Sequence, residues 1–139
     1  MAVPWEDVQR ILKQTKTIAV VGLSDKPDRD SYQIAAYLQQ QGYRIIPVNP
    51  RATEVLGEKA YPSLRDVPEP VDVVDIFRRS EDVPPIVADA IAIGAKAVWM
   101  QAGIVNEEAA ASAEAAGLTV IMDACMRSTH RTLKAAGRM

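Results

Sequence analysis

The sequence predicts a doubly wound α/β fold, in which about five parallel strands form one sheet with helices on both faces. Five short runs of consecutive β-branched and other apolar residues alternate along the chain with longer, helix-favouring segments. Consecutive apolar residues are typical of strands buried on both faces, as in a parallel sheet covered by helices. Because crossovers between parallel strands are right-handed, few topologies remain, and we expect the strand order 3-2-1-4-5, with the reversal between strands 1 and 4. A length of 139 residues fits one domain, residues 1–139.

The first half of the chain supplies two helices and two strands in alternation. Pro4 suits the first turn of a helix, and the segment after it carries one apolar stripe at helical spacing. Asp30 or Ser31 could cap the second helix, and Gly42 ends it. The dipeptide Asn49-Pro50 breaks the chain after the second strand. The expected order is helix 4–14, strand 17–21, a helix from 30 or 31 to 41, and strand 44–48.

The second half begins with a turn-rich connection over 55–61 and then continues the alternation. Pro84 and Pro85 are tolerated only in the first turn of a helix, which Ser80 or Asp82 could cap. Asn106 caps an Ala-rich helix. The expected order is a short helical turn within 63–68, strand 71–77, a helix that Gly94 ends, strand 96–100, a helix that Gly117 ends, strand 118–122 and a last helix over roughly 127–136.

The charge balance argues against a nucleic-acid partner. Eighteen acidic and sixteen basic side chains give a formal net charge of −2, so a general electrostatic hold on DNA or RNA is not expected. No apolar run approaches the ~20 residues of a membrane helix. The N-terminus from Met1 lacks the basic start and apolar stretch of a signal peptide. We therefore expect neither a nucleic-acid nor a membrane partner.

Cysteine and histidine each occur once, as Cys125 and His130. No intrachain disulfide can form, and a cytoplasmic location is the simplest interpretation. A zinc site of Cys and His ligands within one chain is excluded, and we expect no metal site. A spacing of five residues places the two side chains off a common helix face, so we do not expect a catalytic pair. We interpret Cys125 as an inert buried thiol and His130 as a surface or helix-end residue.

The loops that follow the strands form the candidate site, because ligands of doubly wound sheets bind outside the carboxyl ends of the strands where the order reverses. The first loop carries Gly22 for close backbone approach, hydroxyls on Ser24 and Ser31, and positive charges on Lys26 and Arg29. Together with the start of the following helix, these groups suit a phosphate or pyrophosphate. The alternative is that Gly22 and Ser31 only turn the chain and cap the helix.

The usual signals of a nicotinamide dinucleotide site are absent. The loop after the first strand has one glycine instead of the three of G-x-G-x-x-G. The second strand ends in Val48-Asn49-Pro50-Arg51, without a carboxylate for the ribose hydroxyls. A neutral Asn with a nearby Arg favours a ligand that bears an extra phosphate near its ribose, and both NADP and coenzyme A qualify. Alternatively, Asn49-Pro50 is only a turn.

Five segments, in order and at similar spacing along the chain, resemble one known family. They are Ile18–Ser24, Pro47–Pro50, Val71–Arg78, Trp99–Gly103 and Met122–Met126. On these segments the chain resembles the small stand-alone coenzyme A-binding proteins, which are similar to the nucleotide-binding domain of the succinyl-CoA synthetase α subunit. The resemblance implies a Rossmann-like fold that binds coenzyme A in the strand-end cleft. It does not imply ligase activity, since the second synthetase domain has no counterpart in these 139 residues.

The resemblance also relates segments to parts of the ligand. Gly22–Ser24 matches the family's loop against the pantetheine–phosphate portion, and Val48–Arg51 matches the surroundings of the adenosine and its phosphates. Ile76–Arg78 matches the wall after the third strand, while Gln101 and Gly103 match the segment after the fourth. With the loop groups above, the predicted cofactor-binding residues are Gly22, Leu23, Ser24, Lys26, Ser31, Val48, Asn49, Pro50, Arg51, Ile76, Phe77, Arg78, Gln101 and Gly103.

Several other residues receive structural interpretations. Asp72 and Asp75 lie three positions apart on a predicted strand, so they point to opposite faces and are not a paired acid–base set. Asp75, near the carboxyl end, could touch a ligand or cap a loop. Trp99 is expected in the core. The Ala-rich helix is expected to pack on its own sheet, although packing on a second subunit would make a homo-oligomer.

Two functions remain open at this point. The first is a module that binds coenzyme A or an acyl-CoA without catalysis of its own, which the scarcity of catalytic side chains favours. The second is an NADP-dependent oxidoreductase or a subunit of an acyl-CoA-handling enzyme, which would require a partner domain for its substrate.

Overall fold

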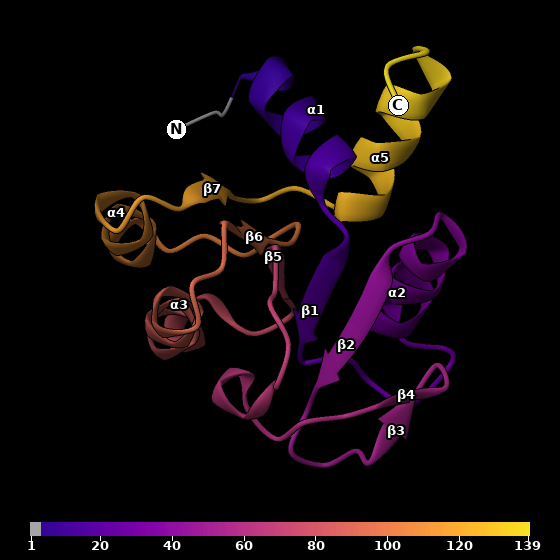
Figure 1. Cartoon of the computed structure of the whole chain (residues 1–139), viewed down its shortest axis with the longest axis vertical. Coiled ribbons are helices and arrows are strands. Elements are labelled where there is room, and N and C mark those ends of the chain that lie inside the picture. The colour runs from indigo at the N-terminus through magenta and orange to yellow at the C-terminus, as the bar shows by residue number, and fades with distance from the viewer. Residues whose placement is uncertain (1–3) are drawn as a thin grey trace.

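A computed structural model describes residues 4–139 and contains a five-stranded parallel sheet (Figure 1). The segment from Met1, noted above for its lack of a signal-peptide pattern, begins outside the described residues. The strands of the sheet are β1 (Thr17–Val21), β2 (Arg44–Val48), β5 (Val73–Ile76), β6 (Ala97–Met100) and β7 (Thr119–Ile121). The four pairings within the sheet are all parallel. The doubly wound α/β class is therefore confirmed.

The strand order differs from the predicted 3-2-1-4-5. The sheet runs β2-β1-β5-β6-β7, so the third of its strands in sequence pairs with β1 instead of β2, and the reversal lies between β1 and β5. Pro47 in β2 gives the physical reason. Its carbonyl accepts a hydrogen bond from Tyr61 N–H on the side away from β1, and the N–H and C=O of one strand residue point to the same side. A further strand on that side would need the N–H that proline lacks, so β2 is an edge strand.

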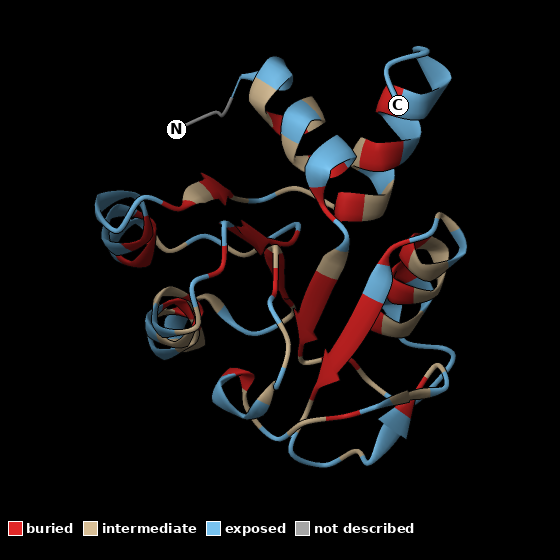
Figure 2. Cartoon of the chain, viewed as in Figure 1, coloured by how far each residue is buried: buried red, intermediate tan, exposed pale blue. Residues whose placement is uncertain are grey.

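Helices cover both faces of the sheet, as predicted (Figure 1). On one face lie α3 (Val83–Ala92) and α4 (Glu107–Ala115), and on the other lie α1 (Trp5–Gln14), α2 (Asp30–Gln40) and α5 (Met126–Ala135). Each face has its own cluster of buried apolar residues, and the strands between them are buried on both sides (Figure 2). The Ala-rich α4 packs its buried alanines into the cluster on its own sheet, which was the favoured prediction.

A small hairpin occupies the connection between β2 and β5, where the sequence predicted turns. The strands β3 (Glu54–Val55) and β4 (Glu58–Lys59) pair in antiparallel fashion. After them, Tyr61 forms an isolated bridge with Val48 at the outer side of β2, and a 3-10 turn follows at η1 (Leu64–Asp66). A second 3-10 turn, η2 (Ser80–Asp82), leads into α3.

The predicted cap of one helix is confirmed, and that of another is wrong. The Oδ1 of Asn106 accepts a hydrogen bond from Ala109 N–H and caps α4 as predicted. Neither Asp30 nor Ser31 caps α2, because the N-cap position belongs to Arg29, whose side chain makes no capping bond. The hydroxyl of Ser31 instead accepts from the N–H of Ser24, in the loop before the helix.

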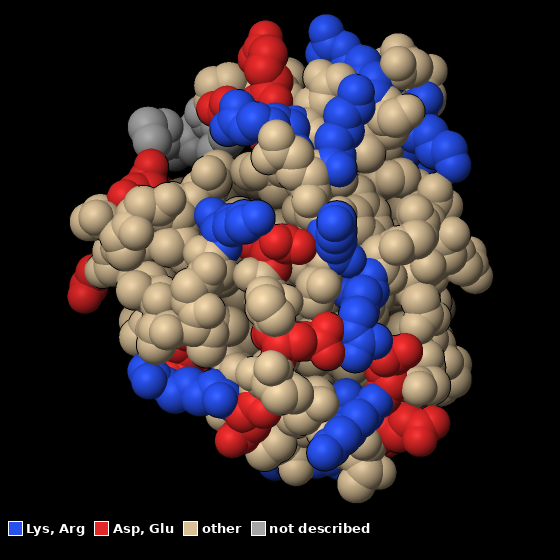
Figure 3. All heavy atoms as spheres, in the orientation of Figure 1, with Lys and Arg blue, Asp and Glu red and all other residues tan. Residues whose placement is uncertain are grey.

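Among residues 4–139, no helix has the length and apolarity that a membrane span requires. On the face drawn in Figure 3, acidic and basic side chains are interspersed, without a broad area of one sign.

Candidate functional site

A hollow of about 640 Å³ opens at the carboxyl edge of the sheet, beside the reversal between β1 and β5. It lies between the loop after β1 and the end of β5. Five of its lining residues are among the predicted site residues, namely Gly22, Ser24, Lys26, Ser31 and Phe77. Asp28, Arg29 and Asp30 line it as well. The corrected strand order moves the reversal point but keeps the loop after β1 beside it.

Gly22 allows the loops of β1 and β5 to approach each other closely. Its φ of +88° lies in the left-handed region, and a Cβ added there would lie 2.3 Å from the carbonyl oxygen of Phe77. The backbone is fixed on both sides, since Gly22 N–H donates to Val48 O and Phe77 N–H donates to Val21 O. A side chain at position 22 would separate the two walls of the hollow.

Hydrogen bonds within the loop hold its shape. Ser24 N–H donates to Ser31 Oγ at 3.0 Å, and Lys26 N–H donates to Ser24 Oγ at 3.1 Å. The loop is thereby tied to the first turn of α2. Because α2 has no side-chain cap at Arg29, its first N–H groups are available to an anion in the hollow.

Asn49 connects the ends of the first two strands. Its Nδ2 donates to Leu23 O at 2.9 Å, and its Oδ1 accepts from Arg51 N–H at 2.9 Å. The side chain thus shapes the turn at Pro50, which was the alternative interpretation of this segment. Arg51 is exposed and does not line the hollow.

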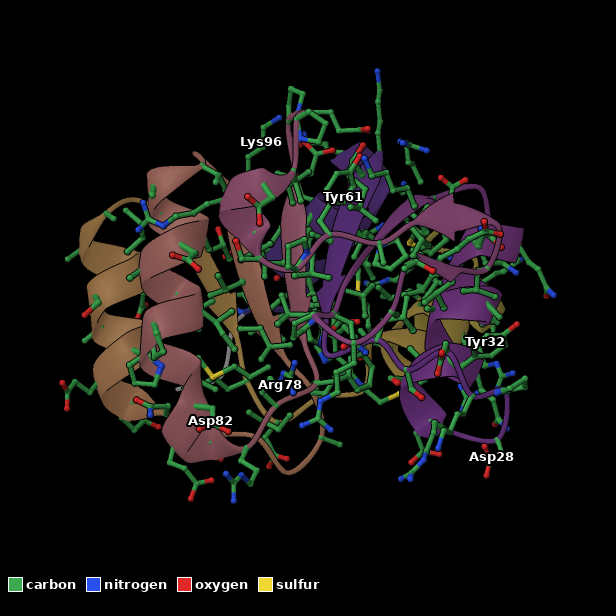
Figure 4. The ribbon with its side chains drawn as sticks, turned by 90° about the horizontal axis from the view of Figure 1, so that it is seen from below. Asp28, Tyr32, Tyr61, Arg78, Asp82 and Lys96 are labelled. Carbon is green, nitrogen blue, oxygen red and sulfur yellow. The ribbon has the colours of Figure 1, made fainter. Side chains whose placement is uncertain are left out.

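Arg78 lies between this hollow and a smaller one. The second hollow, of about 210 Å³, includes Val48, Pro50 and Arg78 in its lining. The Nε of Arg78 is 3.3 Å from the position that a Cβ on Gly22 would take, so its guanidinium lies across this glycine. Figure 4 shows Arg78 on the same edge as Asp28 and Asp82, with Lys96 on the opposite side of the view. A planar cation in this position suits a phosphate.

Six predicted residues line neither hollow, namely Asn49 and Arg51, described above, and Leu23, Ile76, Gln101 and Gly103. Leu23 and Ile76 are fully buried in the apolar clusters, so only their backbone could face a ligand. The side chain of Gln101 is buried and its Oε1 accepts from Met126 N–H at 3.1 Å. The N–H of Gly103 donates to Asp123 Oδ1 at 2.6 Å. The segment after β6 therefore holds the start of α5 and the turn before it.

The structure also assigns the remaining polar residues. Asp72 accepts from the N–H groups of Lys16 and Thr17, a structural role. Asp75 is fully buried and neither caps a loop nor lies open to a ligand. Trp99 is buried as predicted, and its Nε1 donates to Ala124 O at 2.8 Å.

The surface position expected for His130 is wrong. The residue is buried, and its Nδ1 lies 2.7 Å from the hydroxyl of Tyr37. Burial and the charge of Lys134 lower the pKa of His130. The helical spacing in the sequence did not show that α2 would cover this face of α5.

Comparison with known proteins supports the predicted resemblance. YneT of Bacillus subtilis (strain 168), an uncharacterized protein, is 45% identical over 128 residues, which make up 92% of this chain and 95% of YneT. The ADP-forming acetate–CoA ligase II of Archaeoglobus fulgidus is 34% identical over 107 residues, which cover 76% of this chain but only 16% of the ligase. The solved structure of a hypothetical protein from Pyrococcus horikoshii OT3 superimposes with a TM-score of 0.92 at 42% identity, covering 95% of this chain and 93% of that one.

These similarities agree with the Rossmann-like fold seen here and extend over nearly the whole chain. The family described as a CoA binding domain matches residues 16–131, and the chain therefore belongs to that family.

Proposed function

We propose that the protein binds coenzyme A or an acyl-CoA at the carboxyl edge of the sheet, without catalysis of its own. The observation that carries this proposal is a pair of neighbouring hollows, one lined by Gly22 and the other by Arg78, whose side chain lies across Gly22, in a chain whose residues 16–131 match the CoA-binding family. An elongated ligand with phosphates in its middle suits two neighbouring hollows better than one closed pocket. The cytoplasm, where CoA is abundant, is the compartment that we propose.

The charges around the hollows support the same ligand. Lys26, Arg29 and Arg78 supply cations at one edge, and the uncapped start of α2 adds backbone N–H groups. Asp28 and Asp30 lie among them, so the edge is of mixed charge and would accept phosphates only where the cations and N–H groups face inward. We propose that Lys26 and Arg78 contact the ligand phosphates.

Thermal-shift titration and calorimetry with CoA, acetyl-CoA, NAD and NADP, under reducing conditions, test this proposal. A ligand at ~100 times its Kd stabilises the folded state by about 2.7 kcal/mol, so a CoA species should raise the melting temperature clearly. Absence of stabilisation by CoA and acetyl-CoA at millimolar concentration would overturn the proposal. A preference for NADP would support the oxidoreductase instead.

Two arginine variants locate the binding site. Arg78→Ala should weaken CoA binding by about 10-fold or more, because it removes a charge-assisted contact with a phosphate. Arg79→Ala is the matched control, since the neighbouring Arg79 is also exposed and pairs with Glu81 and Asp82 instead of lining a hollow. Equal effects of the two substitutions would place the ligand elsewhere.

A role as one component of an acyl-CoA-handling enzyme is the second candidate. The observation that favours it is the similarity to an acetate–CoA ligase, of which this chain covers 16%. That role predicts a second component that supplies the substrate site. Co-purification of such a subunit, with turnover of an acyl-CoA only by the pair, would distinguish it from the binding module.

A further inference from the structure

The one cysteine of the chain, expected to be a buried thiol, lies only half-buried at the carboxyl edge of the sheet. Cys125 is the N-cap residue of the 10-residue helix α5 and is half-buried. It packs against the apolar cluster that lies between the sheet and α1, α2 and α5. Its sulfur forms no disulfide within the described part of the chain.

A buried carboxyl group without a partner faces the same cluster. Asp75 is fully buried, and within the described part of the chain neither of its oxygens has a hydrogen-bond partner. Because Val73 belongs to this cluster and alternate strand residues share a face, Asp75 also points toward it. An unpartnered buried polar group costs free energy, and a fold keeps one where it serves a purpose.

Hydrogen bonds hold Ala124, the neighbour of Cys125, at the end of β6, the strand that pairs with β5. Asp75 is paired in register with Trp99 of the neighbouring strand β6. The indole of Trp99 donates to Ala124 O, and Ala124 N–H donates to Met100 O at 3.3 Å. The chain after β7 thus crosses back over β6 toward α2 before α5 begins (Figure 1).

Phe77 connects this region with the larger hollow. It follows Asp75 by two residues at the end of β5, lines the hollow beside Gly22, and packs against the same apolar cluster as Cys125. The larger hollow and the thiol therefore lie beside the same apolar cluster, and Phe77 belongs to both the hollow and the cluster.

The groups around the two residues favour a thiolate beside a neutral acid. Burial raises the pKa of Cys125, but the N–H and hydroxyl of Ser128, with the side chain of Gln101, lower it by more. Burial raises the pKa of Asp75 well above its usual range, and the nearby Cys125 raises it further. The two shifts thus run in opposite directions, since the pKa of the thiol is lowered and the pKa of the acid is raised.

We propose that Cys125 is a covalent attachment site for the thiol end of CoA, formed by exchange with a disulfide of CoA. This inference rests on the proposed function. The Cys125 thiolate attacks one sulfur of the CoA disulfide, a new S–S bond joins Cys125 to one CoA, and the S–S bond of the reagent breaks. The other CoA leaves as a thiolate and takes a proton from water. The protein thiol is oxidised to the disulfide level and half of the reagent is reduced, so no further oxidant is required.

Intact-protein mass spectrometry tests the proposal on the full chain. The native protein should gain one CoA from CoA disulfide at least about tenfold faster than it gains mercaptoethanol from hydroxyethyl disulfide, because the bound reagent is held beside the thiol. The preference should disappear in urea and in Arg78→Ala, while Arg79→Ala keeps it. Cys125→Ser, which lacks the thiol, should form no adduct.

Binding of reduced CoA to the same preparation separates the two proposals. If reduced CoA binds but CoA disulfide forms no adduct, or reacts no faster than hydroxyethyl disulfide, the covalent site is overturned and the binding function stands. If reduced CoA does not bind either, the binding function fails together with the inference that rests on it.

Discussion

At the scale of single residues, Gly22 sets the geometry on which the candidate site depends. Several glycines of the chain have a positive φ, but at Gly22 alone among them does a Cβ also meet the backbone of another element. Gly42, with a φ of +100°, has nothing within 4 Å of the corresponding position. The contrast separates the cost of a left-handed backbone from the cost of a steric clash.

Gly22→Ala should therefore destabilise the protein more than Gly42→Ala. The strain of a left-handed backbone costs ~1–2 kcal/mol at either position, and at position 22 the clash with Phe77 O adds a further cost of about 2 kcal/mol or more. Urea unfolding of both variants measures the difference. Equal losses would mean that the walls of the hollow move apart freely.

Asp75 makes the folded state less stable as the pH rises, which is the opposite of the effect of a carboxyl group whose pKa is lowered on folding. Its pKa is raised in the folded state by burial and by Cys125, while in the unfolded chain it is about 3.9. Above that value the unfolded state releases the proton and the folded state keeps it. The stabilising contribution is thus complete below about pH 4 and falls as pH rises toward the raised pKa, by up to about 1.4 kcal/mol per pH unit.

Comparison with Asp75→Asn isolates this effect, because the amide is neutral at every pH and His130 titrates alike in both proteins. Urea unfolding at pH 5, 6 and 7 should show the wild type losing stability relative to the variant at each step. A difference that stays constant with pH would mean that Asp75 is ionised in the folded protein.

At the scale of elements, α4 and the turn before α3 are joined by one side chain. Asn106 Oδ1 caps α4 by accepting from Ala109 N–H, and its Nδ2 donates to Ser80 O at 2.9 Å. The cap was predictable because Asn followed by two glutamates is a local signal. The bond to Ser80 was not, because it depends on how α3 and α4 pack side by side.

Asn106→Ala should cost about 1–2 kcal/mol of unfolding free energy, since it removes the cap and leaves Ser80 O without this donor. Ser112→Ala in the same helix is the control and should change stability by less than about 0.5 kcal/mol, because its exposed hydroxyl only bonds Glu108 O. Guanidinium unfolding of both variants measures the loss of unfolding free energy. If Asn106→Ala loses no more than Ser112→Ala, the cap is dispensable.

At the scale of the whole molecule, the fold class was predictable from five apolar runs, but the strand order was not. Adjacency in the sheet depends on which side of β1 the third strand takes, and the decisive bond of Pro47 is to Tyr61, in a segment expected only to turn. Pro47 could have indicated an edge strand, and this local signal favours the observed order over the predicted one.

Only part of the candidate site was predictable from the sequence. Loops after parallel strands meet at one edge, so the groups of Gly22, Lys26 and Arg78 could be placed together. Gln101 holds the start of α5, and Asp75 is buried beside Cys125. Both arrangements depend on the chain crossing back after β7. No local pattern in the sequence encodes that crossing.

The two apolar clusters share the same five strands, and this predicts a single cooperative unfolding transition. Loss of the helices on one face would expose strand residues on that face and remove the support of the other. Trp99 lies fully buried on the face of α1, α2 and α5, whereas Trp5 is 50% exposed. Trp5→Phe therefore leaves fluorescence to Trp99, which reports one face, while far-ultraviolet circular dichroism reports the helices of both. The two signals should show coincident midpoints in urea. A fluorescence transition at lower urea than the loss of helix would mean that the face of α1, α2 and α5 unfolds first, and that the sheet with α3 and α4 is stable without it.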